Sequence, residues 1–320
     1  ILKIEDLKVF FPIKKGLMQR TIGHVRAVDG VSLQINPGET LGLVGESGCG
    51  KTTIGRAIVR LNEPTSGRIL YNNDTDLLKL EGEELRKMRK KFQIVFQDPY
   101  SSLNPRKTVK HLISEVLMVQ MGMSQEEAFA EVRHLMNEVG LNAVYAERYP
   151  HEFSGGQRQR IAIAKAISLQ PEFLVCDEAV SALDVSIQSQ IINLLMDLKE
   201  KHGDMTYLFI SHALNVVEHI SDRVAVMYLG KIMEYATTEE LFDHAQHPYT
   251  KALLSAIPII SGMKQRDRIV LQGEVPSAAN VPSGCRFHTR CPYATEQCSL
   301  EEPELKEIAP GHFCACHHEF

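Results

Sequence analysis

A glycine-rich segment near residue 50 constrains the fold of this chain more than any other feature. It follows the pattern G-x-x-x-x-G-K-[ST]. Glycines let the backbone curl so that successive N–H groups point inward at phosphate oxygens. Lys51 supplies a positive charge for the β- and γ-phosphates, and the hydroxyl of Thr52 can bind Mg²⁺. The segment predicts a nucleotide site made by Gly45, Glu46, Ser47, Gly48, Cys49, Gly50, Lys51, Thr52 and Thr53.

The sequence around this loop has the context that a phosphate site needs. Thr40–Val44 predicts a short buried strand, and Thr53–Arg60 predicts a helix whose N-terminus faces the phosphates. At 320 residues, the chain exceeds the size at which one core usually keeps growing, so we expect a large domain with an appended module. The formal charge of −5 gives no indication of nucleic-acid binding. Its apolar runs stop short of a membrane span, so any membrane role requires a partner.

Two further segments carry chemistry that suits a nucleotide. Phe173–Asp177 is an apolar, strand-like run that ends in an acid, and Glu178 follows it. In P-loop proteins an Asp at this place holds Mg²⁺, and the next Glu can orient or deprotonate the attacking water. Farther upstream, Ser154, Gly155, Gly156 and Gln157 open a predicted helix. A small hydroxyl and two glycines at a helix start make a second anion site, which one nucleotide in one subunit does not explain.

With these motifs, residues 1–235 resemble the nucleotide-binding subunit of ATP-binding cassette (ABC) transporters. The resemblance implies an ATP hydrolase with an α/β core. It also implies that Phe153–Gln157 is the signature motif, with Phe in place of the usual Leu, which closes over the ATP held by a second subunit. The implied fold is a P-loop core with a parallel sheet, an antiparallel β subdomain and an inserted helical subdomain at about 98–168. A C-terminal extension then covers 236–320.

The resemblance also assigns single residues. Gln97 corresponds to the glutamine that contacts Mg²⁺ or the attacking water, and Asp184 ends the D-loop Ser181–Asp184. His212 corresponds to the switch histidine that contacts the γ-phosphate, and Phe11 is the candidate for stacking on adenine, with Phe10 as the alternative. The implied Mg²⁺ ligands are Thr52, Gln97 and Asp177, and the implied catalytic residues are Lys51, Gln97, Glu178 and His212. Ala179 and Ala213 replace residues common in the family, but neither replacement removes a reacting group.

Three stretches resemble the oligopeptide/dipeptide importer branch: Gln97–Arg106, Tyr149–Gln157 and His247–Ala252. This branch implies a second ATPase subunit, usually a different paralogue, two transmembrane permease subunits and an extracytoplasmic peptide-binding protein. We therefore expect a peripheral protein at the cytoplasmic face of the membrane. Three alternatives remain open: a nickel or metal-chelate importer, a soluble ABC ATPase without a transport role, and a redox- or metal-sensing module. The substrate and the choice between homodimer and heterodimer are not readable.

Five cysteines gather between residues 285 and 316, in a segment 276–320 rich in Pro and Gly. Without an export signal we expect a cytosolic chain, where clustered cysteines favour a metal over disulfides. Zn²⁺ is the alternative, but it favours paired knuckles that this spacing lacks. Wider spacings suit a [4Fe–4S] cluster, and the importer branch implies the ligands Cys285, Cys291, Cys298 and Cys316, with Cys314 as a spare. We expect this segment to pack apart from the ATP site.

Overall fold

The computed structural model describes residues 1–16, 19–203, 205–257 and 268–318. They form two compact units. The first unit combines residues 1–35, 40–78 and 211–320, and the second combines residues 36–39 and 79–210. Segments from both halves of the sequence therefore meet in the first unit. Residues 258–267 of the predicted C-terminal extension lie outside the described residues.

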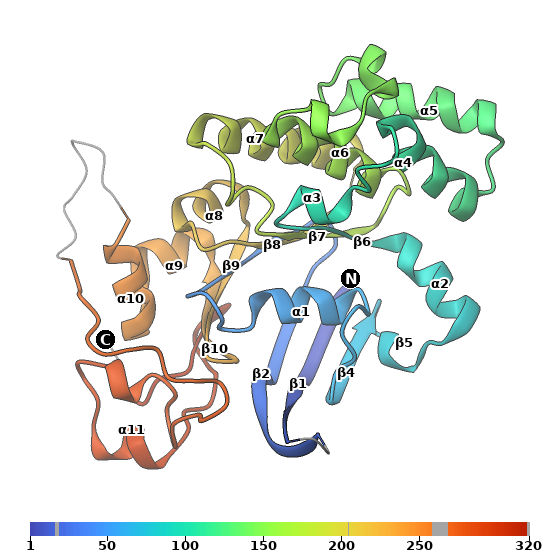
Figure 1. The fold of residues 1–320 in the computed structure, drawn as a ribbon. Helices are drawn as coiled ribbons and strands as arrows, with labels where there is room; N and C mark the ends of the chain where they lie inside the picture. The colour runs from blue at the N-terminus through green and yellow to red at the C-terminus, as the bar shows by residue number, and fades with distance from the viewer. Residues whose placement is uncertain (17–18, 204, 258–267, 319–320) are drawn as a thin grey trace, which may run out of the picture. The chain divides into compact units, whose positions relative to one another are not determined.

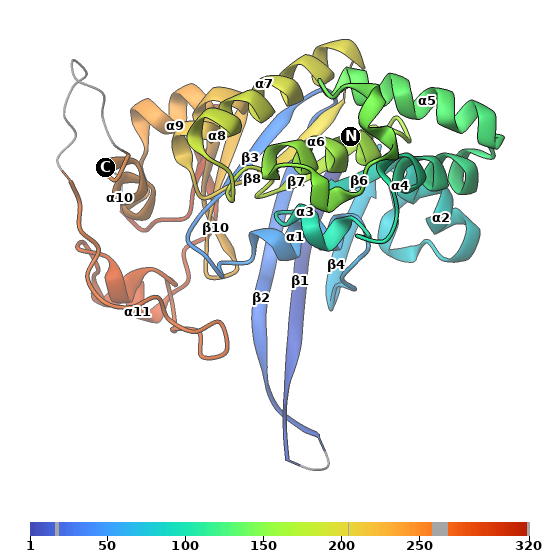
Figure 2. The ribbon, with the colours of Figure 1, turned by 45° about the horizontal axis from the view of Figure 1, so that its top comes forward.

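The N-terminal part of the first unit is an antiparallel sheet, whose first two strands are the long blue ribbons in Figure 2. In its first strand, Leu2 and Ile4 are buried and Lys3 between them is exposed, as expected for a strand with one face in the core. The pairing of the first two strands runs from Leu2 opposite Ile35 to Lys15 opposite Arg20, with four register shifts. In spatial order the strands are β2 (Arg20–Ile35), β1 (Leu2–Lys15), β4 (Ser66–Tyr71) and β5 (Thr75–Asp76).

Five further strands of the first unit follow the order β11-β12-β10-β9-β3. β3 is buried at all five positions and runs parallel to β9, as expected for a strand covered on both faces. The C-terminal segment joins through an antiparallel pair, with Tyr235 opposite Phe313. The cysteine-rich segment is therefore part of the same compact unit as the P-loop. The bounds are β3 (Thr40–Val44), β9 (Arg223–Tyr228), β10 (Lys231–Thr237), β11 (Lys306–Ala309) and β12 (His312–Cys314).

The helix α8 (Leu214–Ile220) packs closely against β3. A Cβ added at Gly42 would lie 2.5 Å from Cγ1 of Val217 and 2.7 Å from Oγ of Ser221, so this position needs glycine. The helix is therefore held against the strand that leads into the P-loop. The helical elements are α1 (Lys51–Ile58), η1 (Leu77–Lys79), α8 (Leu214–Ile220), α9 (Thr238–His244), α10 (Pro248–Ser255), η5 (His288–Arg290) and α11 (Glu296–Leu300).

The second unit contains three parallel strands in the order β8-β7-β6. β7 and β8 are buried throughout, because helices cover a parallel sheet on its faces. The hydroxyl of Tyr207 satisfies a buried acceptor by donating to Leu195 O at 2.9 Å. The strands are β6 (Phe92–Val95), β7 (Phe173–Asp177) and β8 (Thr206–Ile210), and the flanking helices are α2 (Gly82–Lys91) and α7 (Val185–Lys201).

Residues between β6 and β7 are helical, as the period of the sequence predicts (green in Figure 1). α5 begins with a capping box, in which Ser124 and Glu127 each bind the other's backbone N–H. No described helix of the protein is long and apolar enough to cross a membrane. The helical elements are α3 (Pro99–Ser102), α4 (Val109–Val116), η2 (Leu117–Met121), α5 (Gln125–Glu138), η3 (Ala143–Glu147), η4 (Pro150–Glu152) and α6 (Gly155–Ile167).

Candidate functional site

The P-loop connects β3 to α1, as predicted. Gly45, Gly48 and Gly50 have φ values of 149°, 80° and 111°, which favour glycine. A Cβ at Gly45 would lie 2.1 Å from Met227 O, and a Cβ at Gly50 would lie 2.1 Å from Ala27 O. Two of these glycines are therefore required by close backbone approach as well as by conformation. The result is a tight loop that ends at the N-terminus of a helix, where anions bind.

Lys51 is held inside this loop. Its side chain is buried, and Nζ donates to Gly45 O at 2.7 Å and to Glu46 O at 3.0 Å. The ammonium group therefore lies within the arc of backbone that is predicted to bind phosphate. Burial raises the pKa of the neighbouring Cys49 thiol, so this cysteine remains protonated at neutral pH. Thr52, the predicted Mg²⁺ ligand, is half-buried in the first turn of α1.

The first unit also holds His212 and Phe11. Ser211 donates its backbone N–H to Leu43 O at 3.2 Å, which places His212 beside the end of the strand that leads into the P-loop. His212 is exposed. Phe11 lies on β1 opposite Val25 and is 41% exposed, whereas Phe10 is half-buried with the Arg26 guanidinium 5.9 Å from its ring centre. The more accessible ring is thus the one predicted to stack on adenine.

In the second unit, Asp177 and Glu178 follow each other at the end of β7. Asp177 is buried, and Glu178 is half-buried with a φ of 48°, which is uncommon for a residue with a Cβ. The Glu178 N–H donates to Ile210 O at 3.0 Å, and Ser181 donates from both its N–H and its hydroxyl to Glu178 O. These bonds hold a strained conformation, of the kind that gathers at functional sites.

The signature segment begins α6. Ser154 is the N-cap residue: its Oγ accepts the N–H of Gln157 at 3.4 Å, and Gln157 Oε1 accepts the N–H of Ser154 at 3.0 Å. Ser154 and Gly155 are exposed, whereas Gly156 is buried. A Cβ on Gly156 would lie 2.5 Å from Cγ2 of Ile187. Gly156 therefore allows α6 to pack closely on α7, whereas Gly155 lies at the surface.

Two other predicted residues of the second unit are exposed. Gln97 follows β6, and Asp184 immediately precedes α7 without capping it through its side chain. The described residues thus place the predicted positions in two groups. The P-loop, Phe11 and His212 belong to the first unit, whereas Gln97, the signature segment, Asp177, Glu178 and Asp184 belong to the second unit.

The cysteine-rich segment brings four thiols into mutual electrostatic contact. Burial, and to a smaller extent the thiols of Cys298, Cys316 and Cys291, raise the pKa of Cys285 to about 11. Burial also raises the pKa of Cys291 and of Cys316, and each is raised further by its neighbours. The thiols of Cys316 and Cys285 also contribute to raising the pKa of Cys314, so the fifth cysteine of the segment lies near the same group.

The same side chains do not converge on one point. Among the described residues, no group of three or more His, Cys, Asp or Glu side chains is placed to bind a single metal ion. All seven cysteines are free thiols. The sulfur ligands of a cluster bind different irons and can therefore stand farther apart than the ligands of one Zn²⁺. The donor set has the number and kind of groups that a cluster takes.

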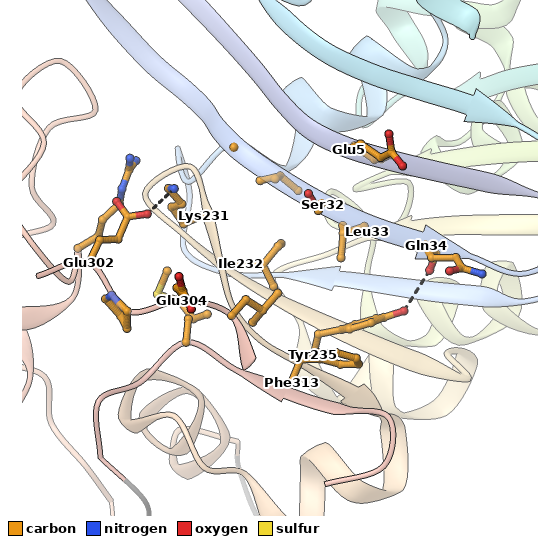
Figure 3. A pocket seen from close by; sticks show the side chains of 18 of the residues that line it. Glu5, Ser32, Leu33, Gln34, Lys231, Ile232, Tyr235, Glu302, Glu304 and Phe313 are labelled. Carbon is orange, nitrogen blue, oxygen red and sulfur yellow. Dashed lines mark hydrogen bonds and ion pairs between the residues drawn. The ribbon is translucent and has the colours of Figure 1, made fainter. Parts of the chain in front are cut away.

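A cavity of about 670 Å³ lies where the C-terminal extension meets β2 and β10 (Figure 3). Tyr235 donates its hydroxyl to Gln34 O at 3.0 Å and lies beside the ring of Phe313, with centroids 5.9 Å apart. At another side of the cavity, Lys231 forms an ion pair with Glu302 at 2.5 Å. The extension is therefore anchored to the sheets by both apolar and charged contacts.

A buried histidine that no sequence pattern singles out connects β12 to β10. His312 Nε2 lies 2.8 Å from Oε1 of Glu234, and Nδ1 lies 3.3 Å from Oε1 of Glu240. The fully buried Glu234 also accepts the backbone N–H groups of Gln246 and His247, at 2.6 and 3.0 Å. The hydrogen bond to Glu234 raises the pKa of His312. Its partners are 72 and 78 positions away, so no local pattern could indicate them.

A glycine-rich loop that binds Lys51 inside its arc and opens a helix beside a parallel strand defines the class of P-loop nucleotide-binding proteins. Comparisons with known proteins narrow this class. The ABC transporter family model matches residues 28–181, and the model described as the oligopeptide/dipeptide transporter C-terminal region matches residues 233–298. The chain therefore belongs to the family of ATP-binding subunits of ABC transporters, which hydrolyse ATP.

Relatives match over almost the whole chain. It is 56% identical over 320 residues to the oligopeptide transport ATP-binding protein AppF of Bacillus subtilis, covering 99% of this chain and 97% of that protein. It is 50% identical over 318 residues to the dipeptide transport ATP-binding protein DppF of Haemophilus influenzae, covering 99% and 96%. The predicted family is thus confirmed.

Solved structures confirm the predicted fold class. The fold is similar to the dimeric, post-hydrolysis ATP-binding cassette MJ0796 bound to ADP and Pi, with a TM-score of 0.66 and 27% identity. That match covers 74% of this chain and 99% of the other. It is also similar to cbiO1 from Clostridium perfringens, part of the ABC transporter complex cbiONQ, with a TM-score of 0.64, 28% identity and coverage of 76% and 91%.

The packing of the signature glycines leads to a first prediction. Gly156→Ala forces its new methyl group against the β-branched Ile187 and should lower the free energy of unfolding by about 1–3 kcal/mol. Gly155→Ala is the matched control, because its Cβ would lie 3.5 Å from Cδ2 of Leu183, an ordinary contact. It should change stability by less than about 0.5 kcal/mol. Urea denaturation without nucleotide measures both values, and equal losses would contradict the packing role of Gly156.

The His312 network predicts a pH dependence of stability. In the unfolded chain His312 titrates near its usual pKa of about 6.5, whereas in the folded protein its pKa is raised. The stabilisation is therefore fully present below about pH 6.5 and is lost as the pH rises through the folded value. The difference in unfolding free energy between wild type and His312→Gln should be larger at about pH 6 than at about pH 9. A difference that grew with pH would rule out a protonated His312 between the two carboxylates.

Proposed function

We propose that this subunit hydrolyses ATP to power the import of peptides. The observation that carries the proposal is the full-length similarity to oligopeptide and dipeptide transport ATP-binding proteins, together with the match of residues 233–298 to the C-terminal region of such transporters. An ATP-binding subunit does not touch the cargo, so the substrate is inferred from these relatives. Import of a nickel or metal chelate is the alternative that the experiment below must separate.

The ATP chemistry is assigned to named residues. Lys51 and the backbone N–H groups of the P-loop bind the phosphates, and Phe11 stacks on adenine. Thr52, Gln97 and Asp177 would hold Mg²⁺, which would neutralise the charge that develops on the phosphates. Glu178 accepts a proton from the attacking water. At the same time the water oxygen bonds to the γ-phosphorus, and the bond between the γ-phosphorus and the leaving ADP breaks. His212 contacts the γ-phosphate. The buried Lys51, the strained Glu178 and the exposed His212 support these roles.

A second subunit completes each site in this proposal. Ser154, Gly155, Gly156 and Gln157 bind the ATP that is held by the P-loop of a second ATPase subunit, a different paralogue, and Asp184 lies at that interface. The exposed N-terminus of α6 supports the assignment, because a helix N-terminus attracts phosphate. The dimeric form of the similar cassette bound to ADP and Pi supports it as well. Two permease subunits and an extracytoplasmic binding protein complete the transporter, with this chain peripheral at the cytoplasmic face.

The cysteine-rich segment holds a [4Fe–4S] cluster in this proposal, bound by Cys285, Cys291, Cys298 and Cys316. The electrostatic interactions among these thiols support a shared site, and the resemblance to the importer branch makes Cys314 the spare. Zn²⁺ is the alternative, and it commonly takes paired knuckles that the spacing of these cysteines lacks. Cys285, Cys291 and Cys316, whose pKa values are raised by burial and by neighbouring thiols, gain from binding a cation, because it favours their thiolate forms.

Transport by a reconstituted complex tests the proposed function. This subunit should co-purify with two permease subunits, and vesicles carrying the complex should accumulate a labelled peptide when Mg-ATP is supplied. Glu178→Gln should lower phosphate release by about 100-fold or more, because the water loses its base while the binding groups remain. The variant should also retain an ATP-bound dimer that light scattering detects.

Glu172→Gln is the matched control. Glu172 lies just before β7 and forms a half-exposed ion pair with Lys91 at 2.8 Å, so its loss should leave hydrolysis within about twofold. Accumulation of a nickel chelate but not of peptide would show that the transporter imports metal chelates and not peptides. Failure to associate with any permease would favour a soluble role. A Glu178→Gln variant that stays monomeric in Mg-ATP with its partner present would refute the sandwich.

Metal analysis tests the cluster. Protein prepared without oxygen should be brown and contain about four irons per chain. Cys285→Ser, Cys291→Ser, Cys298→Ser and Cys316→Ser should each remove the colour, whereas Cys314→Ser should keep it. A colourless protein with one tightly bound Zn²⁺ would show that the segment binds zinc and not an iron–sulfur cluster. Loss of colour in Cys314→Ser but not in Cys316→Ser would show that Cys314, and not Cys316, is the fourth ligand.

A further inference from the structure

An arginine of the cysteine-rich segment binds the P-loop directly. Arg290 Nη1 lies 2.6 Å from Oε2 of Glu46, and Nη2 lies 3.1 Å from Oε1, so the ion pair is bidentate. Only 7% of the Arg290 side chain and 28% of the Glu46 side chain are exposed. A bidentate, largely buried pair of this kind is stronger and more directional than a surface ion pair. It joins positions 244 residues apart in the sequence.

The ion pair is one of several restraints on Glu46. The backbone N–H of Glu46 donates to the Tyr249 hydroxyl at 2.9 Å, and its carbonyl accepts Lys51 Nζ at 3.0 Å. The Tyr228 hydroxyl in turn accepts Arg290 Nη1 at 3.4 Å. The second residue of the P-loop is thus bound through its backbone and its side chain at once, and Arg290 supplies the side-chain restraint.

Other residues between Cys285 and Cys291 contact the same support. Arg286 donates to Asp29 Oδ2 and, at 2.6 Å, to Leu229 O. The fully buried ring of Phe287 lies 5.4 Å from the Tyr228 ring and 5.3 Å from the Tyr249 ring. The segment Cys285–Cys291 therefore holds the backbone and the tyrosines behind the P-loop. Our expectation that the cysteine-rich segment packs apart from the ATP site does not agree with these contacts.

The charge of Glu46 explains why the restraint matters. A carboxylate in a loop that binds phosphates repels its ligand unless a cation compensates it, and the repulsion is strong where water is partly excluded. Arg290 provides this compensation and keeps the carboxylate in one position. Removing the arginine would leave a partly buried carboxylate without its partner, which is more harmful than removing both charges.

We propose that Arg290 is a positioning residue for ATP binding, which neutralises and orients Glu46 and makes ATP affinity depend on the conformation of the segment Cys285–Cys291. The first part rests on the ion pair alone. The second part rests on the proposed cluster, whose ligands Cys285 and Cys291 begin and end this segment. Because coupling between two sites is reciprocal, bound ATP would in turn stabilise the segment around the cluster.

A charge-deletion cycle tests the first part. The dissociation constant of a fluorescent ATP analogue with Mg²⁺ is measured by equilibrium titration for wild type, Arg290→Met, Glu46→Gln and the double variant. Arg290→Met should weaken binding by about tenfold or more, and the loss should shrink in about 1 M salt. The double variant should bind within about threefold of wild type, because the repelling carboxylate is gone. Arg290→Lys should retain part of the affinity, because it keeps the charge without the bidentate geometry.

Rescue by Glu46→Gln would show that Arg290 acts on ATP binding through the Glu46 carboxylate and not through its other contacts. Lys306→Met is the matched control, because Lys306 is an exposed cation of the same extension, 4.0 Å from Glu304, and its loss should leave affinity unchanged. Thermal unfolding of each variant confirms that it folds. Wild-type affinity in folded Arg290→Met would overturn the proposal, as would a double variant that binds as weakly as Arg290→Met.

Cysteine variants test the second part, with iron content and ATP affinity measured on the same samples. Cys291→Ser should lose iron and bind the ATP analogue several-fold more weakly, whereas Cys314→Ser should keep both iron and affinity. Loss of iron with unchanged affinity would overturn the coupling but not the role of Arg290. Wild-type protein without iron would refute the proposed cluster and the coupling to it, and the charge-deletion cycle would still decide the role of Arg290.

Discussion

The fold of the P-loop depends on the direct approach of neighbouring backbone to its glycines. Gly45 lies against the carbonyl of Met227 in β9, and Gly50 lies against the carbonyl of Ala27 in β2. A methyl group at either position would force these strands away from the loop. The two sheets of the first unit therefore meet at the phosphate site, and the place of Lys51 follows from their packing. Because protein interiors are close-packed, such a junction leaves little freedom to its neighbours.

Local patterns were enough to predict most elements that carry the ATP chemistry. The strand Thr40–Val44, the loop and the helix after it are encoded in one continuous stretch, so conformation and chemistry are readable together. The same holds for β7 with Asp177 and for the helix that Ser154 caps. The roles of Gln97, Asp184, His212 and Phe11 came from the resemblance to a family, since each is a single polar or aromatic residue whose own sequence context is uninformative.

Long-range contacts could not be predicted in this way. The pairing of β12 with β10, the approach of His312 to Glu234 and the Arg290–Glu46 ion pair join residues 78 to 244 positions apart. Each depends on tertiary packing and leaves no periodicity in the sequence. The clustered cysteines predict a metal site. The residues between them that contact the P-loop and its surroundings, such as Arg290, follow no distinctive sequence pattern. An interpretation based on motifs alone therefore treats the cysteine-rich segment and the P-loop as separate, although they are in contact in the folded protein.

The position of β12 also bears on how the chain is made. β10 gains its outer neighbour only when His312–Cys314 are available, about 75 residues after β10 itself, and an unpaired strand edge invites pairing with other chains. Until these residues are synthesised, the first unit lacks the strand that pairs with this side of β10. The short β11, with Lys306 and Glu307 exposed, then closes the sheet with a charged border. In the complete chain, pairing with the extension therefore covers the edge of β10 that would otherwise be open.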